Sequence, residues 1–113
     1  MPRKAMTAHS RVASQAVDLL GALIKRRRLE LKLKAADLAE RAGVSRALVY
    51  RIERGDPGCS VGAVFEAAAI VGVPLFDDES GRAVAERLRQ TERELALLPK
   101  AARTSNAPVR DDF

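Results

Sequence analysis

Chemically reactive side chains are scarce in this chain of 113 residues. A single cysteine, Cys59, excludes an internal disulfide and a cysteine-based zinc site. The single histidine, His9, lies in an aperiodic N-terminal stretch and supplies neither a catalytic triad nor a zinc site. No glycine-rich phosphate loop ending in Gly-Lys-Ser/Thr is present. These absences argue against an enzyme, and we expect no metal and no cofactor.

Aromatic residues and long apolar runs are also few. The chain has no tryptophan, one tyrosine and three phenylalanines. No run approaches the ~20 apolar residues that a membrane-crossing helix needs. The apolar residues are mainly alanine, leucine and valine, a mixture that favours packed helices over sheets. We expect an all-α protein without membrane contact, located in the cytoplasm.

Charge is distributed unevenly along the chain, although the net charge is only +5. Residues 1–54 hold 13 Lys/Arg against 5 Asp/Glu, whereas residues 55–113 hold 7 against 10. A basic half joined to an acidic half predicts a polyanionic partner for the first and a different role for the second.

The stretch Ala35–Gly55 is typical of two short helices joined by a tight turn. Gly43 can end the first helix because it adopts a positive φ without a Cβ clash. Ser45 can cap the second helix, and Val49 and Ile52 give that helix an apolar inner face. Its outer face then carries a tyrosine and three arginines, a composition that suits a phosphate-lined groove; the exposed positions are Arg46, Ala47, Tyr50, Arg51 and Arg54.

This stretch resembles the helix-turn-helix of the Xre and phage-repressor family. The resemblance rests on the segments Gly43–Arg46 and Arg51–Gly55 and extends from about Leu20 to Phe76. It implies a compact domain of four to five helices whose second motif helix enters the major groove of DNA. It also implies a bacterial protein of the cytoplasm that is associated with the nucleoid. The expected base-contacting residues are Ser45, Arg46, Ala47, Tyr50 and Arg51, and the expected phosphate contacts are Lys34, Arg41, Arg54 and Arg28.

The sequence departs from the family pattern at two places. Lys34-Ala35 stands where the family commonly has Thr-Gln, and Ala47 replaces a small polar residue. Base recognition is therefore expected to use fewer hydrogen bonds than usual. The resemblance also implies a structural ion pair between Arg28 and Glu53, which would orient the first helix against the recognition helix.

Apolar spacing predicts the helices that flank the motif. A first helix is expected from Ser14 to Leu31, with Leu20, Ile24 and Leu31 on one face. After a Gly/Pro-rich loop, Ser60 is expected to cap a helix over Val61–Val71, whose apolar side chains cover the motif. The expected organisation is a flexible basic arm at residues 1–14, the DNA-binding domain at 15–76, a C-terminal helix at 77–98 and a disordered tail at 99–113 that could bind a partner.

The C-terminal helix, Arg82–Leu98, has apolar residues at alternating spacings of four and three. This spacing fits a dimer contact, and it also fits a helix that packs on its own domain. The residues of this seam are Val84, Leu88, Thr91, Leu95 and Leu98.

The end of this helix, Leu95–Lys100, and the tail that ends in Asp-Asp-Phe resemble antitoxins encoded beside Hip-type kinase toxins. This resemblance implies an autoregulating repressor that binds a palindromic double-stranded DNA operator as a homodimer and holds a Hip-type serine/threonine kinase. Two other interpretations remain open: a stand-alone Xre-type regulator without a toxin, and a helical adaptor that binds protein.

Overall fold

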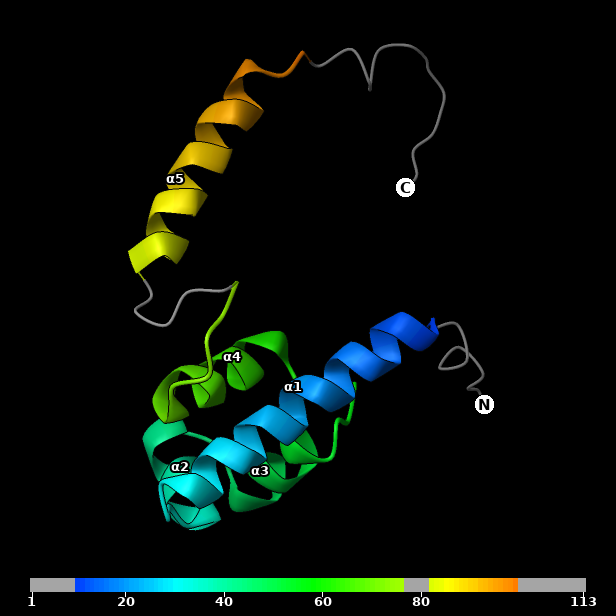
Figure 1. Ribbon diagram of the computed structural model, residues 1–113, viewed down its shortest axis with the longest axis vertical. Helices are drawn as coiled ribbons and strands as arrows, with labels where there is room; N and C mark the ends of the chain where they lie inside the picture. The colour runs from blue at the N-terminus through cyan, green and yellow to red at the C-terminus, as the bar shows by residue number, and fades with distance from the viewer. Residues whose placement is uncertain (1–9, 77–81, 100–113) are drawn as a thin grey trace. The chain divides into compact units, whose positions relative to one another are not determined.

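The computed structural model describes residues 10–76 and 82–99, and Figure 1 shows their secondary structure. Its regular elements are the helices α1 (Arg11–Glu30), α2 (Ala35–Ala42), α3 (Arg46–Glu53), α4 (Val61–Val71) and α5 (Arg82–Leu97). The chain divides into two compact units, Met1–Glu79 with α1 to α4 and Ser80–Phe113 with α5. The expected all-α fold is confirmed, whereas the tails expected to be disordered lie largely outside the described residues.

Serine side chains begin three of the helices, and glycines end two of them. The hydroxyl oxygens of Ser10, Ser45 and Ser60 each accept a hydrogen bond from the backbone amide three residues on, at 3.0, 3.0 and 3.2 Å. Gly43 and Gly72 follow α2 and α4 with φ angles of 72° and 83°. The predicted caps of α2, α3 and α4 are therefore present.

The first helix begins earlier than the sequence predicted. It starts at Arg11 and not at Ser14, because Ser10 caps it and satisfies the amide of Ala13. Residues 11–14 are thus helical and do not belong to a flexible arm. The rest of that expected arm, residues 1–9, lies outside the described residues.

The core of the first unit lies where α2 packs on α3 and α4, and where α1 packs on α3 and α4. Each of the four helices contributes one fully buried large side chain, namely Ile24, Leu38, Val49 and Val71. Because many of the other core side chains are alanine, the helices can approach closely. The other buried residues of this core are Ala35, Ala39, Ile52, Ala67, Ala68 and Val73.

Two residues expected in the core are exposed. Leu31 is 46% exposed because it is the residue after α1, beyond the last buried position of that helix. Val61 is 67% exposed because it is the first residue of α4, whose buried face begins farther along, at Ala67.

Phe65 is half-buried and packs edge-on against Phe76, with ring centroids 6.3 Å apart.

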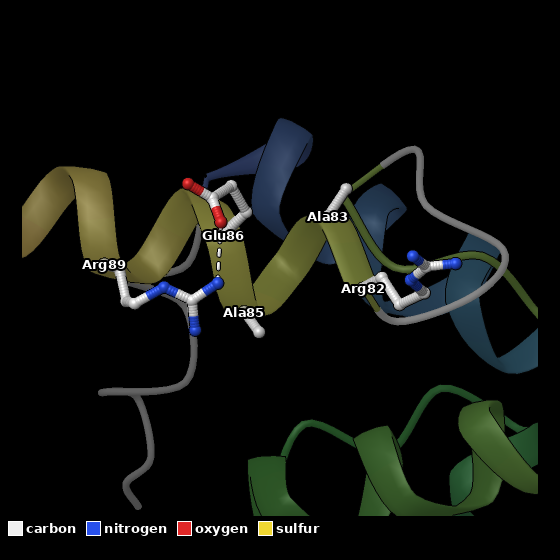
Figure 2. A pocket seen from close by; sticks show the side chains of 5 residues that line it. All are labelled: Arg82, Ala83, Ala85, Glu86 and Arg89. Carbon is white, nitrogen blue, oxygen red and sulfur yellow. Dashed lines mark hydrogen bonds and ion pairs between the residues drawn. The ribbon is translucent and has the colours of Figure 1, made fainter.

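Helix α5 has no buried residue within its described range. Of its predicted seam, Val84 is half-buried, while Leu88, Leu95 and Leu98 are 57%, 62% and 61% exposed. The helix ends at Leu97, so Leu98 lies just beyond its last turn. Polar side chains cover other parts of its surface. Nη2 of Arg89, for example, donates to Oε1 of Glu86 at 2.6 Å in the first half of the helix (Figure 2).

A glycine allows α1 to cross the end of α3 closely. Gly21 is buried, and a Cβ atom at this position would collide with the carbonyl oxygen of Ile52 and lie 3.0 Å from that of Glu53. Helix propensity alone makes Gly21 a mild disadvantage to α1. The structure shows instead that this position needs the absence of a side chain, because the obstacle is backbone that cannot rotate away.

We predict that Gly21→Ala lowers the free energy of unfolding by about 1–3 kcal/mol, since overpacking exceeds the gain in helix propensity. Thermal denaturation measures this change. Gly62→Ala in α4 is the matched control, because a Cβ there meets nothing within 4 Å; this variant should be neutral or slightly more stable. Equal effects of the two substitutions would contradict the crossing described here.

Candidate nucleic-acid interface

The turn between α2 and α3 fixes the direction in which α3 leaves the domain. Gly43 reverses the chain in the left-handed conformation, and the amide of Val44 donates to the carbonyl of Ala39 at 3.0 Å. Val44 is half-buried against the core, and Ser45 then caps α3. Two short helices joined in this way, the second carrying a charged outer face, are the architecture of a helix-turn-helix domain.

The two faces of α3 have opposite character. Val49, Ile52 and Glu53 are buried against the other helices. Tyr50 on the outer face is 45% exposed. The remaining positions expected on that face are exposed at Arg46, Ala47 and Arg54 and half-exposed at Arg51. The sequence pattern thus identified both faces, and it placed the tyrosine and the arginines on the outer one.

A buried ion pair anchors the end of α3 to α1. Nε of Arg28 donates to Oε2 of Glu53 at 2.6 Å, and Nη2 donates to Oε1 at 3.0 Å. The third contact runs from Nη1 to the carbonyl oxygen of Leu33 at 3.0 Å. The two side chains are only 9% and 3% exposed. This bidentate geometry gives both direction and strength to the contact.

The same contacts bear on the proposed roles of these two residues. The hydrogen bond to Glu53 raises the pKa of Arg28 above its ordinary value, against the opposing effect of burial. Residue Arg28 is 7% exposed and its guanidinium is used within the domain. This burial argues against the contact with a DNA phosphate that was expected of Arg28. It agrees with the other expected role of Arg28, the structural ion pair with Glu53.

A second ion pair, which the sequence analysis did not predict, engages one of the expected base-contacting residues. Nε of Arg51 donates to Oδ2 of Asp56 at 2.8 Å, while Oδ1 of Asp56 accepts from the amide of Gly58 at 2.8 Å. The hydrogen bond to Asp56 raises the pKa of Arg51. The hydrogen bonds from Arg51 and Gly58 lower the pKa of Asp56, which is therefore a carboxylate at neutral pH.

The expected phosphate-contacting cations surround this motif. Lys34 immediately precedes α2, Arg41 lies in its last turn, and Arg54 immediately follows α3. All three are exposed. The side chain of Lys34 makes no capping hydrogen bond to α2, so its ammonium group has no role in beginning that helix. The motif therefore presents cations before α2, at its end, and along and after α3.

Other kinds of site find no support in residues 10–76 and 82–99. No group of three His, Cys, Asp or Glu side chains in these ranges could hold a metal ion. Cys59 is a half-buried thiol, and His9 lies outside them. The hollow drawn in Figure 2 is lined only by residues of α5, namely Arg82, Ala83, Ala85, Glu86 and Arg89. No helix of the described parts is long and apolar enough to cross a membrane.

Comparison with protein families agrees with this architecture. A family model described as a helix-turn-helix domain matches residues 19–80, more than half of the chain and a range that includes most of α1 and all of α2, α3 and α4. The chain belongs to this helix-turn-helix family, whose members are DNA-binding regulators and typically not enzymes. No curated protein and no solved structure matches the chain significantly.

The buried ion pair yields a prediction on stability. Glu53→Gln leaves the Arg28 guanidinium buried without its counter-charge, so the free energy of unfolding should fall by about 3–5 kcal/mol. Glu30→Gln is the matched control, because it removes the exposed pairs with Arg26 and Arg27 and should cost less than about 1 kcal/mol. Thermal denaturation measures both. A Glu53→Gln variant with unchanged melting and altered DNA sequence preference would contradict the structural role.

Proposed function

We propose that this protein is a transcriptional repressor that recognises a specific palindromic operator through the outer face of α3. The observation that carries the proposal is the combination of a cationic outer face with an inner face anchored by core packing and the Arg28–Glu53 ion pair. A helix held in this way can enter the major groove without first becoming ordered, which favours specific binding.

Within this proposal, the residues of the helix-turn-helix motif divide into a base-reading group and a supporting group. Arg46, at the first position of α3, and Arg51 can each form two hydrogen bonds to a guanine, worth about 1–3 kcal/mol of discrimination. Ala47 can contact a thymine methyl group, and Tyr50 can reach the groove wall. The hydroxyl oxygen of Ser45 already accepts a hydrogen bond from the amide of Leu48, so Ser45 would approach the bases while it still caps α3.

The supporting group contacts the DNA backbone. Lys34, Arg41 and Arg54 are exposed cations that can bind phosphates, and such contacts set the position of the domain without reading sequence. Their contribution to affinity depends on the salt concentration, because phosphate contacts release counterions. Base and phosphate contacts should therefore be separable by mutation.

We predict that Arg46→Ala relaxes preference at one or two base pairs, whereas Lys34→Ala weakens binding to all sequences alike and reduces the salt dependence by about one counterion. Binding to an array of duplex variants, measured at several salt concentrations, distinguishes these results. Lys25→Ala on the exposed surface of α1 is the charge-matched control and should change neither. Uniform loss for both Arg46→Ala and Lys34→Ala would refute the assignment of Arg46.

A homodimer is the form in which we propose that the protein acts, with α5 as the contact. Leu88 and Leu95 are exposed in the described unit and lie seven residues apart on one face. Thr91 lies between them, and its hydroxyl donates to the carbonyl of Arg87 at 2.7 Å, so the seam can be buried without leaving this group unsatisfied. Two copies on a two-fold operator would place their recognition helices about 34 Å apart.

The antitoxin role is a narrower proposal within this function. It is supported by the resemblance of residues 95–100 and the following tail to antitoxins of Hip-type serine/threonine kinases, and most of these residues lie outside the described ranges. A stand-alone Xre-type regulator would share the DNA interface and the dimer but would hold no kinase. A protein-binding adaptor would lack salt-sensitive binding to duplex DNA.

We predict that the tagged chain, expressed from its native operon, purifies as a homodimer with a stoichiometric kinase. Size measurement with and without promoter DNA checks the dimer, and a Leu88→Glu/Leu95→Glu variant should be monomeric. A dimer that shifts its promoter but brings no kinase would leave the stand-alone repressor and end the antitoxin proposal. A wild-type monomer on DNA would contradict the role given to α5.

A further inference from the structure

Residue 56 is joined to Arg51 by both its backbone and its side chain. The amide of Asp56 donates to the carbonyl oxygen of Arg51 at 3.0 Å, and its carboxylate accepts from Nε of Arg51 at 2.8 Å. The carboxylate is itself held, because Oδ1 accepts from the amide of Gly58 at 2.8 Å. The loop after α3 thus fixes an acceptor beside the side chain that emerges from the last turn of α3.

The contact uses one nitrogen of the Arg51 guanidinium and leaves the other two for a different acceptor. Only Nε bonds to Asp56, and the second carboxylate oxygen bonds to Gly58 and not to Arg51. The two terminal nitrogens carry four of the five N–H donors of the group and form a planar fork. The Arg51 side chain remains 43% exposed, so its pairing with Asp56 does not bury it.

We propose that Asp56 is a positioning residue that orients Arg51 for an end-on, bidentate contact with guanine. This inference rests on the proposed function. A long arginine side chain loses rotational freedom when it binds a base, and a fixed partner at Nε removes part of that cost before DNA arrives. The geometry favours this role over masking, because a masking carboxylate would occupy the terminal fork.

The position of Asp56 has a second consequence for DNA binding. Its carboxylate lies beside a helix that approaches a polyanion, so its negative charge disfavours every DNA sequence equally. Asp56 should therefore raise discrimination while lowering non-specific affinity. These opposite effects on discrimination and on non-specific affinity distinguish positioning from the alternatives. A purely structural residue would raise both discrimination and non-specific affinity, and a masking residue would lower both.

The test begins with the wild-type protein and a library of randomised 20-base-pair duplexes, from which the preferred sequence is selected. The base pair whose preference disappears in Arg51→Ala identifies the position that Arg51 reads. At that base pair, Asp56→Asn should reduce discrimination by about tenfold, within the range of a lost bidentate contact. Its affinity for a duplex of unrelated sequence should rise or stay unchanged.

Three controls separate positioning from stability and from general charge. In the Arg51→Ala background, Asp56→Asn should have no further effect on discrimination. Asp37→Asn removes one exposed carboxylate from α2 and should leave the preference unchanged. Asp56→Ser keeps a side-chain acceptor for the Gly58 amide and removes the one for Arg51. If Asp56→Asn is unstable, Asp56→Ser takes its place, and the same loss of discrimination is expected.

Each remaining outcome overturns the inference. Unchanged discrimination in folded Asp56→Asn and Asp56→Ser would show that Arg51 needs no positioning. A rise in both discrimination and non-specific affinity in Asp56→Asn would make Asp56 a masking residue. No loss of preference in Arg51→Ala would remove the base contact itself. In those cases the selected sequence still supports a specific DNA-binding protein, whereas failure of the wild type to select any sequence would refute both proposals.

Discussion

The buried pair of Arg28 and Glu53 is the interaction on which the arrangement of the DNA-binding unit depends. It joins the last part of α1 to the end of α3, and through the Leu33 carbonyl it also holds the segment that leads into α2. Gly21 lies on the same helix and lets the two backbones approach closely where Glu53 ends α3. The recognition helix is therefore fixed at its C-terminal end by charge and close contact, and at its start by the Ser45 cap.

Local signals predicted the helix-turn-helix correctly because each acts within a few residues. Gly43 and Ser45 set the turn, and Ser60 and Gly72 set the limits of α4, as the structure has them. The start of α1 was predicted three residues too late because residues 11–14 lack an apolar face, whereas Ser10 begins a helix by capping and not by burial.

Contacts between distant residues could not be read from spacing. Periodicity identified an apolar face of α1 that includes Leu20 and Ile24, but nothing in it indicated that a carbonyl of α3 would lie against Gly21. The partnership of Arg28 with Glu53 came from family resemblance. The pairing of Arg51 with Asp56 was missed, although an acid five residues after an arginine is a usable signal when a helix ends between them. For α5, the sequence specifies an apolar face but not its partner.

The most direct test of this account is a nuclear magnetic resonance titration of the isotope-labelled protein with its selected duplex. The account predicts that amide and arginine side-chain signals change mainly in residues 34–54, including Arg46 and Arg51, and that the signals of buried Arg28 change little. Perturbations concentrated in α4 or α5, with α3 unaffected, would contradict the claim that the outer face of α3 binds DNA.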